Sequence, residues 1–497
     1  MARDSAIKTR EEDYSAWYLD VIAHGDLLDE APVRGCKVLK PHGFAIWEAI
    51  VRDLDARFKE TGHVNAYFPL FIPMSFLSKE AEHVEGFAKE CAVVTHHRLR
   101  SVTTEDGKQA VEPDPASKLE EPLIVRPTSE TIIWHMYGRW IDSWRDLPVL
   151  INQWANVVRW EMKTRPFLRT AEFLWQEGHT AHATEDEALA EARQMLDVYA
   201  SFAEQTLAVP VLKGTKSARE RFAGAVDTYT IEAMMQNGWA LQAGTSHFLG
   251  QNFAKAFDVT FQDADGKRDY VWATSWGVST RLIGAVIMTH SDDDGLVLPP
   301  AVAPIQVVII PVFKNKDKEV VMDAVNKLFA ELKPHFRVKV DDRDNMRPGA
   351  KYFEWEQKGV PLRLEIGPRD VKKGQAFSKK RTGGGKFGIP FEGIEGHVRE
   401  VLDGMQSDML QVARDRQAAA TYTFDSGSMD DFASLISSQP GFYRVPWGGD
   451  DDDEGRIKEL TKATVRCFPF DEDSAEGLTC PLTGKPAAQW AVFARAY

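Results

Sequence analysis

Charged and aromatic residues alternate closely in the stretch VRWEMKTRPFLRTAEFLWQEGHTAHAT, which covers residues 158–184. A solvated helix would separate apolar from charged residues with a period of 3.6, whereas close alternation is typical of a strand. On a strand, Arg159 and Glu161 would lie on one face and Trp160 on the other. A half-exposed sheet with surface ion pairs would explain one such pair. A whole cluster of charges favours a functional site.

Two helices are predicted from apolar residues that recur with a helical period. The first covers residues 43–62, where Gly62 follows as a residue suited to ending a helix. Its apolar face holds Trp47, Ile50, Val51, Leu54 and Phe58. The second begins at a capping box formed by Thr184 and Glu187. Its apolar face holds Leu189, Ala192, Leu196, Tyr199 and Ala203.

Short strands and turns are expected in the rest of this first part of the chain. A strand-like run, NAYFPLFIP, contains Pro69, and residues 96–121 form a polar hairpin or loop rather than core. Asp265 and Gly266 separate the alternating runs FDVTFQ and DYVWATSW, which predicts an antiparallel hairpin. We therefore expect a largely antiparallel sheet with helices around it.

The pattern changes after the stretch LVLPPAVAPI. A strand (IQVVII), a helix whose apolar face includes Val321 and Leu328, and two further strands (FRVKVD and PLRLEIG) predict an α/β unit. Past residue 425 the chain becomes acidic and rich in turns, and it ends in the strand-like QWAVFARAY. We expect three domains, covering residues 1–300, 301–408 and 409–497.

Composition limits which binding partners and which cellular compartment are expected. The chain has 497 residues, a net charge of −14 and four cysteines, so there is no overall attraction to nucleic acid and no disulfide framework. Residues 363–386 nevertheless hold eight Lys or Arg and two acidic residues, which indicates either a local RNA-binding surface or a solvated, partly disordered loop. The N-terminal residues and the lack of a long apolar run predict a cytoplasmic protein without membrane contact.

Arginine and aromatic residues in the 158–184 stretch are suited to binding a nucleotide. Arg159 and Arg169 can clamp phosphate or carboxylate groups, and Phe173 offers a ring face to a purine. The sequence contains neither a Walker A loop nor a GxGxxG motif. Nucleotide binding would therefore depend on arginines and aromatics carried by a sheet.

These motifs resemble those of the class II aminoacyl-tRNA synthetases, and specifically the prolyl-tRNA synthetases of the archaeal and eukaryotic-like type. The segment around Pro69 resembles motif 1, the family's dimer interface, VVRWE with RPFLRTAEFLWQEGH resembles motif 2, and SWGVSTRLIG resembles motif 3. RPTSE and LQAGTSHFLGQNF are similar to the family's proline and ATP loops, and residues 347–370 to its anticodon-binding domain. The resemblance implies an α+β multidomain fold: an antiparallel catalytic core with helices, an α/β anticodon-binding domain and a small α/β C-terminal domain.

The resemblance also implies an activity and its site. Proline and ATP would form prolyl-adenylate and pyrophosphate, and the prolyl group would pass to tRNA(Pro), with Mg²⁺ accompanying ATP in a homodimeric enzyme. Arg159, Glu161 and Arg281 would be catalytic. The implied ATP-binding residues are Arg159, Glu161, Arg169, Phe173, Gln242, Thr245 and Arg281. The implied proline-binding residues are Thr128, Glu130, Arg159, Trp175, Glu177, His179, His247 and Ser279.

Alternatives remain for single residues and for the whole chain. Taken alone, His179 would be a hydrogen-bonded structural histidine, Trp175 a core residue and Glu177 a carboxylate that orients its neighbours. Another synthetase of the same subclass, such as a threonyl or glycyl enzyme, is one alternative function. A synthetase-like protein that binds tRNA without catalysis is another, although such a protein would be expected to lose the arginines of motifs 2 and 3.

The sequence departs from the family pattern at two features that many members carry. Many members of the family bind a structural zinc through two pairs of C-terminal cysteines, but here Gly448 and Asp453 replace the first pair, and Thr483 accompanies Cys480 at the second. Zinc requires four thiolate or imidazole ligands, so we expect no structural zinc and no other metal site. Bacterial-type members also carry an editing domain as a large insertion between motifs 2 and 3, and the short span here predicts its absence.

Overall fold

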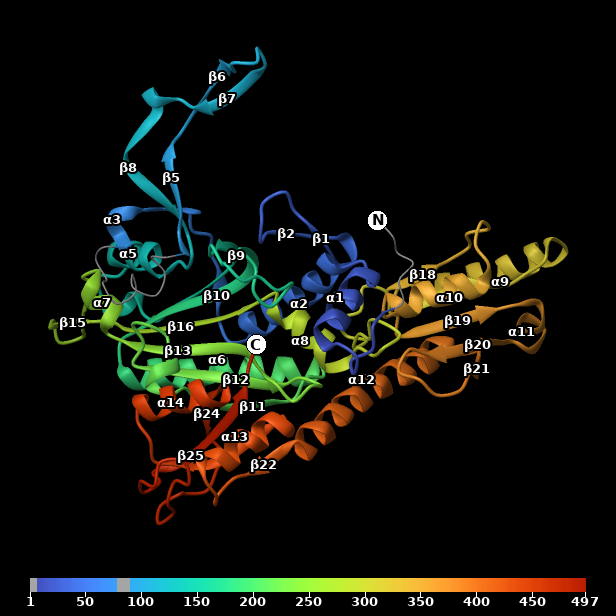
Figure 1. Cartoon of the computed structure of the whole chain (residues 1–497). Coiled ribbons are helices and arrows are strands. Elements are labelled where there is room, and N and C mark those ends of the chain that lie inside the picture. The colour runs from blue at the N-terminus through green and yellow to red at the C-terminus, as the bar shows by residue number, and fades with distance from the viewer. Residues whose placement is uncertain (1–6, 78–89) are drawn as a thin grey trace.

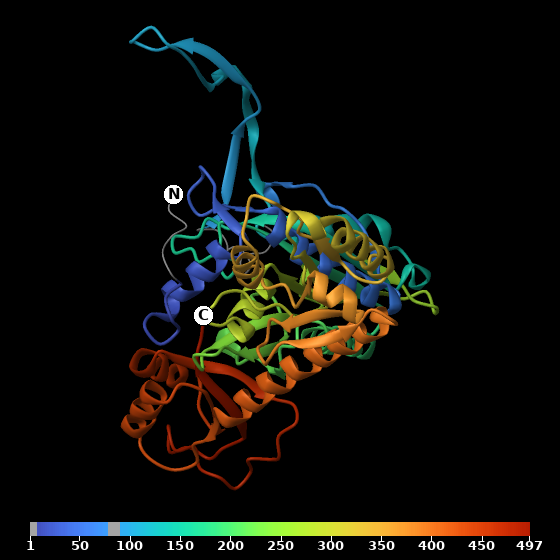
Figure 2. The same cartoon turned by 90° about the vertical axis from the view of Figure 1, so that its right-hand side faces the viewer.

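Figure 1 presents the computed structural model of the chain, which describes residues 7–77 and 90–497. A large twisted sheet forms the centre of the molecule, with an α/β unit at one side and the C-terminal strands and helices below. Figure 2 gives the view turned by 90°, in which a narrow two-stranded arm projects from the body. No helix within the described ranges is long and apolar enough to cross a membrane.

The central sheet has eleven strands in the order β22-β23-β25-β24-β11-β12-β13-β16-β10-β9-β3. Neighbouring strands are antiparallel except for β3 with β9 and β22 with β23. The strands from the first part of the chain are β3 (Val64–Asn65), β9 (Val149–Val158), β10 (Glu172–His182), β11 (Val211–Thr215), β12 (Asp227–Met234), β13 (Ala240–Gly250) and β16 (Trp272–Ser279). The expected antiparallel catalytic core is therefore confirmed.

Helices cover one face of this sheet and enclose the largest core cluster. The two helices expected from periodicity are α2 (Pro41–Glu60) and α6 (Glu185–Gln205), and the capping box of Thr184 and Glu187 is present at the start of α6. Gly62 lies just beyond α2 with a φ of +88°, a left-handed conformation that suits glycine. The other helices on this body are α1 (Tyr14–His24), α3 (Met74–Leu77), α5 (Glu130–Trp140), α7 (Asn252–Ala256) and α8 (Arg281–His290).

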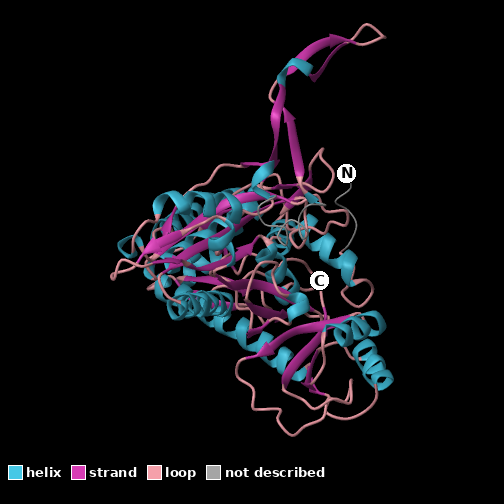
Figure 3. Cartoon of the chain, turned by 90° about the vertical axis from the view of Figure 1, so that its left-hand side faces the viewer, coloured by secondary structure: helices cyan, strands magenta, loops and turns pink. Residues whose placement is uncertain are grey.

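A long β-arm leaves the body between motifs 1 and 2. Its base is the three-stranded sheet of β4 (Phe71–Pro73), β8 (Lys118–Val125) and β5 (Ala92–His96), and its tip is the hairpin of β6 (Leu99–Thr103) and β7 (Gln109–Pro113). Figure 3 shows how far this arm extends from the other elements. The polar hairpin expected at 96–121 is confirmed. A second expected hairpin, around Asp265 and Gly266, is formed by β14 (Thr260–Gln262) and β15 (Arg268–Tyr270).

The α/β unit is a five-stranded sheet in the order β18-β17-β19-β20-β21 with helices packed against it. Its strands are β17 (Val307–Pro311), β18 (Val338–Val340), β19 (Leu362–Ile366), β20 (Gln375–Lys380) and β21 (Phe387–Pro390). Its helices are α9 (Lys318–Leu332), α10 (Pro348–Gln357), α11 (Pro368–Lys373) and the long α12 (Ile394–Ala419). The expected boundary after residue 408 lies inside α12, which leads diagonally to the C-terminal domain (Figure 1).

The basic segment at 363–386 is mostly regular structure, so the interpretation as a solvated loop is wrong for most of its length. It contains β19, α11 and β20. Arg363 is buried and pairs with Glu356 at 2.8 Å and Glu365 at 3.1 Å. Three of its eight cations, Arg363, Lys386 and Arg381, are in internal ion pairs. The remaining cations include Lys372 and Lys373, which are exposed at the end of α11.

The C-terminal domain extends the catalytic sheet instead of forming a separate one. Its strands are β22 (Thr421–Thr423), β23 (Phe442–Trp447), β24 (Ala463–Pro469) and β25 (Gln489–Arg495), and its helices are α13 (Met429–Ser438) and α14 (Asp451–Thr461). The pairing of β24 with β11 joins the two domains, with Gly214 opposite Pro469. Trp447 and Phe493 stack edge to face in its core at 5.3 Å.

Two strand predictions are wrong in part. Strand β9 ends at Val158, so Arg159, Trp160 and Glu161 lie in the loop before β10 and do not alternate across a strand. The alternation of charged and aromatic residues does not indicate a strand there, because these side chains project from irregular backbone, into a cavity in one case and to the surface in another. The run NAYFPLFIP is divided between β3 and β4, and residues 66–70 belong to neither strand.

Candidate functional site

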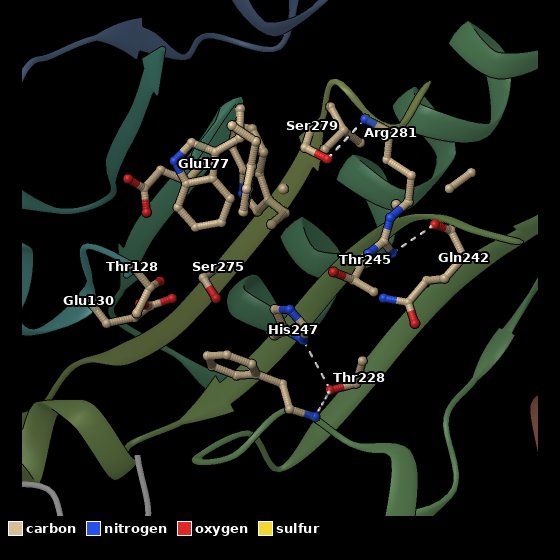
Figure 4. Close-up of a pocket in the computed structure, with 18 of the residues that line it drawn as sticks. Thr128, Glu130, Glu177, Thr228, Gln242, Thr245, His247, Ser275, Ser279 and Arg281 are labelled. Carbon is tan, nitrogen blue, oxygen red and sulfur yellow. Dashed lines mark hydrogen bonds between the residues drawn. The ribbon is translucent and has the colours of Figure 1, made fainter. Parts of the chain in front are cut away.

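A cavity of about 300 Å³ opens above the central sheet, and strands β10, β13 and β16 supply most of its walls. Twelve sequence-predicted residues line it, together with others that the sequence did not indicate: Thr128, Glu130, Arg159, Phe173, Trp175, Glu177, His179, Gln242, Thr245, His247, Ser279 and Arg281. Figure 4 shows acidic side chains at one end and Arg281 at the other. Glu161 and Arg169 lie outside this lining and pair with each other at 3.4 Å.

The acidic end is built on Glu177, which is buried on β10. Its Oε1 accepts hydrogen bonds from Gln153 Nε2 at 2.7 Å and from Ser129 Oγ, and its Oε2 lies 3.0 Å from His179 Nε2. Thr128 donates its hydroxyl proton to Glu130, the first residue of α5. The strands and the helix start thus hold two carboxylates at one end of the cavity, where a substrate cation would find acceptors.

Glu177 and His179 form a buried ion pair. Burial alone would raise the pKa of Glu177 and lower the pKa of His179. The hydrogen bond and the opposite charge of the partner outweigh burial in both cases, so the pKa of Glu177 is lowered and the pKa of His179 is raised. The interpretation of Glu177 as a carboxylate that orients its neighbours is therefore consistent with its contacts.

The neighbouring His247 is neutral. Burial, with a smaller effect from His179, lowers its pKa to about 3. Its Nδ1 lies 3.0 Å from Thr228 Oγ1, and Phe222 stacks on its ring with centroids 4.5 Å apart. Ser275 also lines this part, and its buried hydroxyl has no hydrogen-bond partner among the described residues.

Sequence reasoning missed Phe222, Thr228 and Ser275. Phe222 lies in an irregular segment without periodicity, so no local pattern could have identified it. Ser275 is the first residue of the recognised motif 3 (SWGVSTRLIG) on β16, and the strand period would place it on the same face as Ser279, which was identified. This strand period of two was the one signal in the sequence that could have identified Ser275.

Arg159 enters the cavity between two aromatic rings. Its guanidinium lies 5.5 Å from the Phe173 centroid and 5.6 Å from the Trp175 centroid, and Nε donates to the Pro127 carbonyl at 3.0 Å. Burial lowers the pKa of Arg159, although the charges of Glu130 and Glu177 oppose this effect. Stacking on both rings directs the group to one place in the cavity.

Arg281 begins helix α8 and reaches the same cavity. Its Nε donates to the Leu168 carbonyl at 3.3 Å and Nη1 to the Gln242 carbonyl at 3.4 Å. Burial, with the charges of Arg169 and Arg159, lowers its pKa to about 10, so it stays protonated at neutral pH. Three guanidinium groups that affect one another in this way favour the binding of an anion.

A buried carboxylate on strand β12, beside the cavity, is already neutralised. Glu232 lies opposite Gln242 in the β12–β13 ladder, and Lys216 Nζ and Arg466 Nε donate to it at 2.8 Å and 3.0 Å. Burial alone would raise the pKa of Glu232, but the charges of Arg466 and Lys216 outweigh burial and lower it. Arg466 belongs to the C-terminal domain, so that domain completes the charge balance beneath the site.

The positions where relatives would hold zinc contain other groups. Lys485 Nζ lies 2.6 Å from both Asp450 and Asp453, and Thr483 Oγ1 donates to the Gly448 carbonyl at 3.3 Å. Cys480 is buried in the apolar core. Within the described residues there is no group of three or more His, Cys, Asp or Glu side chains placed to hold a metal ion.

The last residue of the sequence packs against the catalytic domain. The Tyr497 hydroxyl accepts a hydrogen bond from Asn237 Nδ2 at 2.7 Å, and Arg165 of the motif 2 loop lies 4.7 Å from the Tyr497 ring centroid. The Tyr497 amide donates to the Ala240 carbonyl at 3.1 Å. The C-terminal domain thus contacts the loop between β9 and β10 directly.

Comparison with known families agrees with this architecture. Residues 111–290 match the family model "tRNA synthetase class II core domain (G, H, P, S and T)". Residues 306–401 match "Anticodon binding domain", and residues 429–497 match "Prolyl-tRNA synthetase, C-terminal". The three matches follow one another along the chain and occupy the catalytic sheet, the α/β unit and the strands that extend the sheet.

Curated relatives cover nearly the whole chain. Proteins named "Proline--tRNA ligase" from Phocaeicola vulgatus, Porphyromonas gingivalis and Bacteroides fragilis are each 59% identical over 98% of this chain and 98% of the relative. These organisms are bacteria, so the archaeal and eukaryotic-like label finds no support in the origin of these relatives. On this evidence the chain belongs to the proline–tRNA ligases, the prolyl-tRNA synthetase family of class II.

Proposed function

We propose that this chain activates L-proline with ATP to give prolyl-adenylate and pyrophosphate, and then transfers the prolyl group to tRNA(Pro), releasing AMP. The observation that carries the proposal is the separation of charge in the cavity, with carboxylates at one end and the Arg281 guanidinium at the other, while Arg159 lines the same cavity. A zwitterion can lie along this direction with its ammonium towards Glu130 and its carboxylate towards Arg159.

The proposed mechanism depends on positioning and charge neutralisation. Arg159 bridges the proline carboxylate and the α-phosphate, so that two anions can approach each other. Thr128 and Glu130 accept the two N–H groups of the secondary ammonium, while Trp175 and His247 bound the ring. The other proposed contacts to the ring are Glu177, His179 and Ser279.

The nucleotide occupies the cationic end. Phe173 and Arg281 enclose the adenine, and Gln242 and Thr245 contact the nucleotide from β13. Glu161 and Arg169 act from the rim, where the charge of Arg169 already affects Arg281. When bound with ATP, Mg²⁺ would neutralise the phosphates, which would be its main ligands, as that cation prefers.

Pyrophosphate exchange into ATP tests the proposal. With each of the twenty amino acids supplied separately, we expect exchange with proline and little with threonine or glycine. Exchange driven by threonine or glycine would favour the alternative synthetases. No exchange with any amino acid, together with retained tRNA binding, would favour a non-catalytic tRNA-binding protein.

The oligomeric state, the type within the family and the cellular location are also part of the proposal. We propose a homodimer formed through the motif 1 region, a cytoplasmic location, and the archaeal and eukaryotic-like type in the sense of domain organisation. The span from β10 to β16 supports this domain organisation, because it consists of strands and helices that belong to the body. An editing domain is therefore not expected, and alanyl-tRNA(Pro) formed in error should persist with the purified enzyme.

A further inference from the structure

We propose that helix α14 of the C-terminal domain positions the segment 216–222, which closes one side of the amino-acid pocket. The inference rests on the proposed function, because it identifies this cavity as the proline pocket. It assigns α14 a part in amino-acid recognition, although the helix itself does not reach the cavity. Its residues are therefore positioning residues and not catalytic ones.

Three contacts join α14 to the segment. Ser217 Oγ donates to Glu454 Oε2 at 2.8 Å, and both side chains are buried. Arg219 Nη1 donates to the Asp451 carbonyl at 3.0 Å, and Lys458 Nζ lies 3.6 Å from Glu220 Oε1. Two acceptors of helix α14, the Glu454 carboxylate and the Asp451 carbonyl, and one donor, the Lys458 ammonium, thus contact successive residues of the segment.

The start of the segment is held by the same domain. Lys216 is buried, and its Nζ donates to the Arg466 carbonyl of β24 at 2.9 Å as well as to Glu232 at 2.8 Å. Beyond this anchor the chain leaves β11, which ends at Thr215. The C-terminal domain therefore fixes the point at which the segment departs from the sheet.

The other end of the segment forms the pocket wall. Glu220 and Phe222 both line the cavity. Phe222 stacks on His247 at 4.5 Å, and its amide donates to Thr228 Oγ1 at 3.1 Å, while that hydroxyl also lies 3.0 Å from His247 Nδ1 (Figure 4). A displacement of the segment would therefore move the aromatic wall beside a residue proposed to contact proline.

Local structure alone cannot hold this wall in place. The segment contains a single 3₁₀ turn, η4 (Ala218–Glu220), which has no side-chain cap. Turns of this length have poor hydrogen-bond geometry and depend on tertiary contacts. The buried contact between Ser217 and Glu454 is the strongest of these contacts by burial, so it is the one to remove.

The test is kinetic and uses the full chain. In Glu454→Ala we expect the KM for proline in pyrophosphate exchange to rise about tenfold, with the KM for ATP unchanged, because a buried hydrogen bond to a charged group is lost. Glu454→Gln keeps an acceptor for Ser217 and should restore a KM near that of the wild type. Ser217→Ala removes the same bond from the opposite side and should reproduce the effect.

The matched control is Glu472→Ala, in the same domain. Its carboxylate pairs with Arg444 at 2.7 Å, so this variant loses a similar ion pair away from the segment, and it should keep the wild-type KM for proline. Hydrogen–deuterium exchange supplies a measurement that does not depend on activity. Peptides covering residues 216–225 should exchange faster in Glu454→Ala and Ser217→Ala than in Glu472→Ala.

The outcomes separate the two proposals. An unchanged KM for proline together with unchanged exchange at residues 216–225 in the folded Ser217→Ala variant would overturn the positioning role. Equal increases in the KM for ATP and for proline would also overturn it, because they would indicate general damage. A wild-type chain without proline-dependent activity would overturn the proposed function, while the hydrogen-exchange comparison would still decide the positioning role.

Discussion

Arg159 and Arg281 hold half-buried positive charge in the cavity, and this charge defines the chemistry of the site. Removing such groups from water is unfavourable unless an anion meets them, and burial lowers the pKa of both. The folded chain accepts this unfavourable free energy before a substrate binds, because strands and stacked rings already fix the two guanidinium groups. A site prepared in this way gains more from an anionic transition state than a flexible one would.

Replacing Arg159 should remove proline activation and leave the fold intact. In Arg159→Ala we expect pyrophosphate exchange to fall on the order of 10³-fold, since the clamp between carboxylate and phosphate is lost. Arg159→Lys should also be poor, because a single ammonium cannot reproduce the bidentate fork. Circular dichroism would verify folding, and near-normal exchange in a folded Arg159→Ala variant would contradict the assignment.

The Glu177–His179 pair should give the stability of the chain a defined pH dependence. The raised pKa of His179 stabilises the fold below pH 6.5, and this contribution is lost as the pH rises through the raised value. The lowered pKa of Glu177 stabilises the fold above pH 4.5, and this contribution is lost as the pH falls through the lowered value. The combined effect is therefore complete between these two pH values.

Thermal unfolding of the wild type and of Glu177→Gln measures this effect. The difference in Tm between the two should be largest between pH 4.5 and pH 6.5 and should shrink on both sides. A difference that stays constant from about pH 4 to about pH 9 would show that ionisation of the pair does not contribute.

The site residues that could be predicted from sequence are those that lie on strands or at helix starts. Trp175, Glu177 and His179 share a face of β10, and the period of two that places them together is visible in the sequence. Phe222 reaches the cavity because contacts with a distant domain hold it there, and no local pattern records such contacts. Arg159 was identified by its chemistry, although its strand placement was wrong.

At the level of elements, regular periodicity gave correct predictions where one apolar face was buried. Helix α6 begins at its capping box and packs Ala192, Leu196 and Tyr199 into the core. Periodicity and composition could not predict the structure of the basic segment 363–386, because its positive side chains have two different roles. Arg363 and Arg381 neutralise internal carboxylates, whereas Lys372 and Lys373 face solvent. Composition alone does not distinguish these two cases.

The lysines of this segment should help to hold tRNA. Reversing the charge at Lys372, Lys373, Lys379 and Lys380 should raise the KM for tRNA about tenfold and flatten its dependence on salt, because contacts to phosphates are lost. Proline-dependent pyrophosphate exchange should stay unchanged and serves as the control. Aminoacylation measured at several salt concentrations would detect the change, and an unaltered KM for tRNA would remove this surface from the proposed interface.

For the whole molecule, the C-terminal domain should be stable without zinc. Lys485 lies between Asp450 and Asp453, and its hydrogen bond is the main cause that lowers the pKa of Asp450 to about 2. We expect purified protein to contain far less than one zinc per chain by elemental analysis, and EDTA to leave the Tm unchanged. Stoichiometric zinc, or a Tm that falls with EDTA, would show that other ligands complete a site.

The pairing of β24 with β11 has a consequence for synthesis on the ribosome. The chain leaves the catalytic sheet after β16, builds the α/β unit, and only then supplies the strands that cover β11. Throughout that interval the nascent sheet presents an uncovered edge, and such edges can pair with other chains. A ribosome that stalls before residue 463 would therefore release a chain whose core is largely built but whose edge is open to aggregation, and chaperone demand should be concentrated in this window.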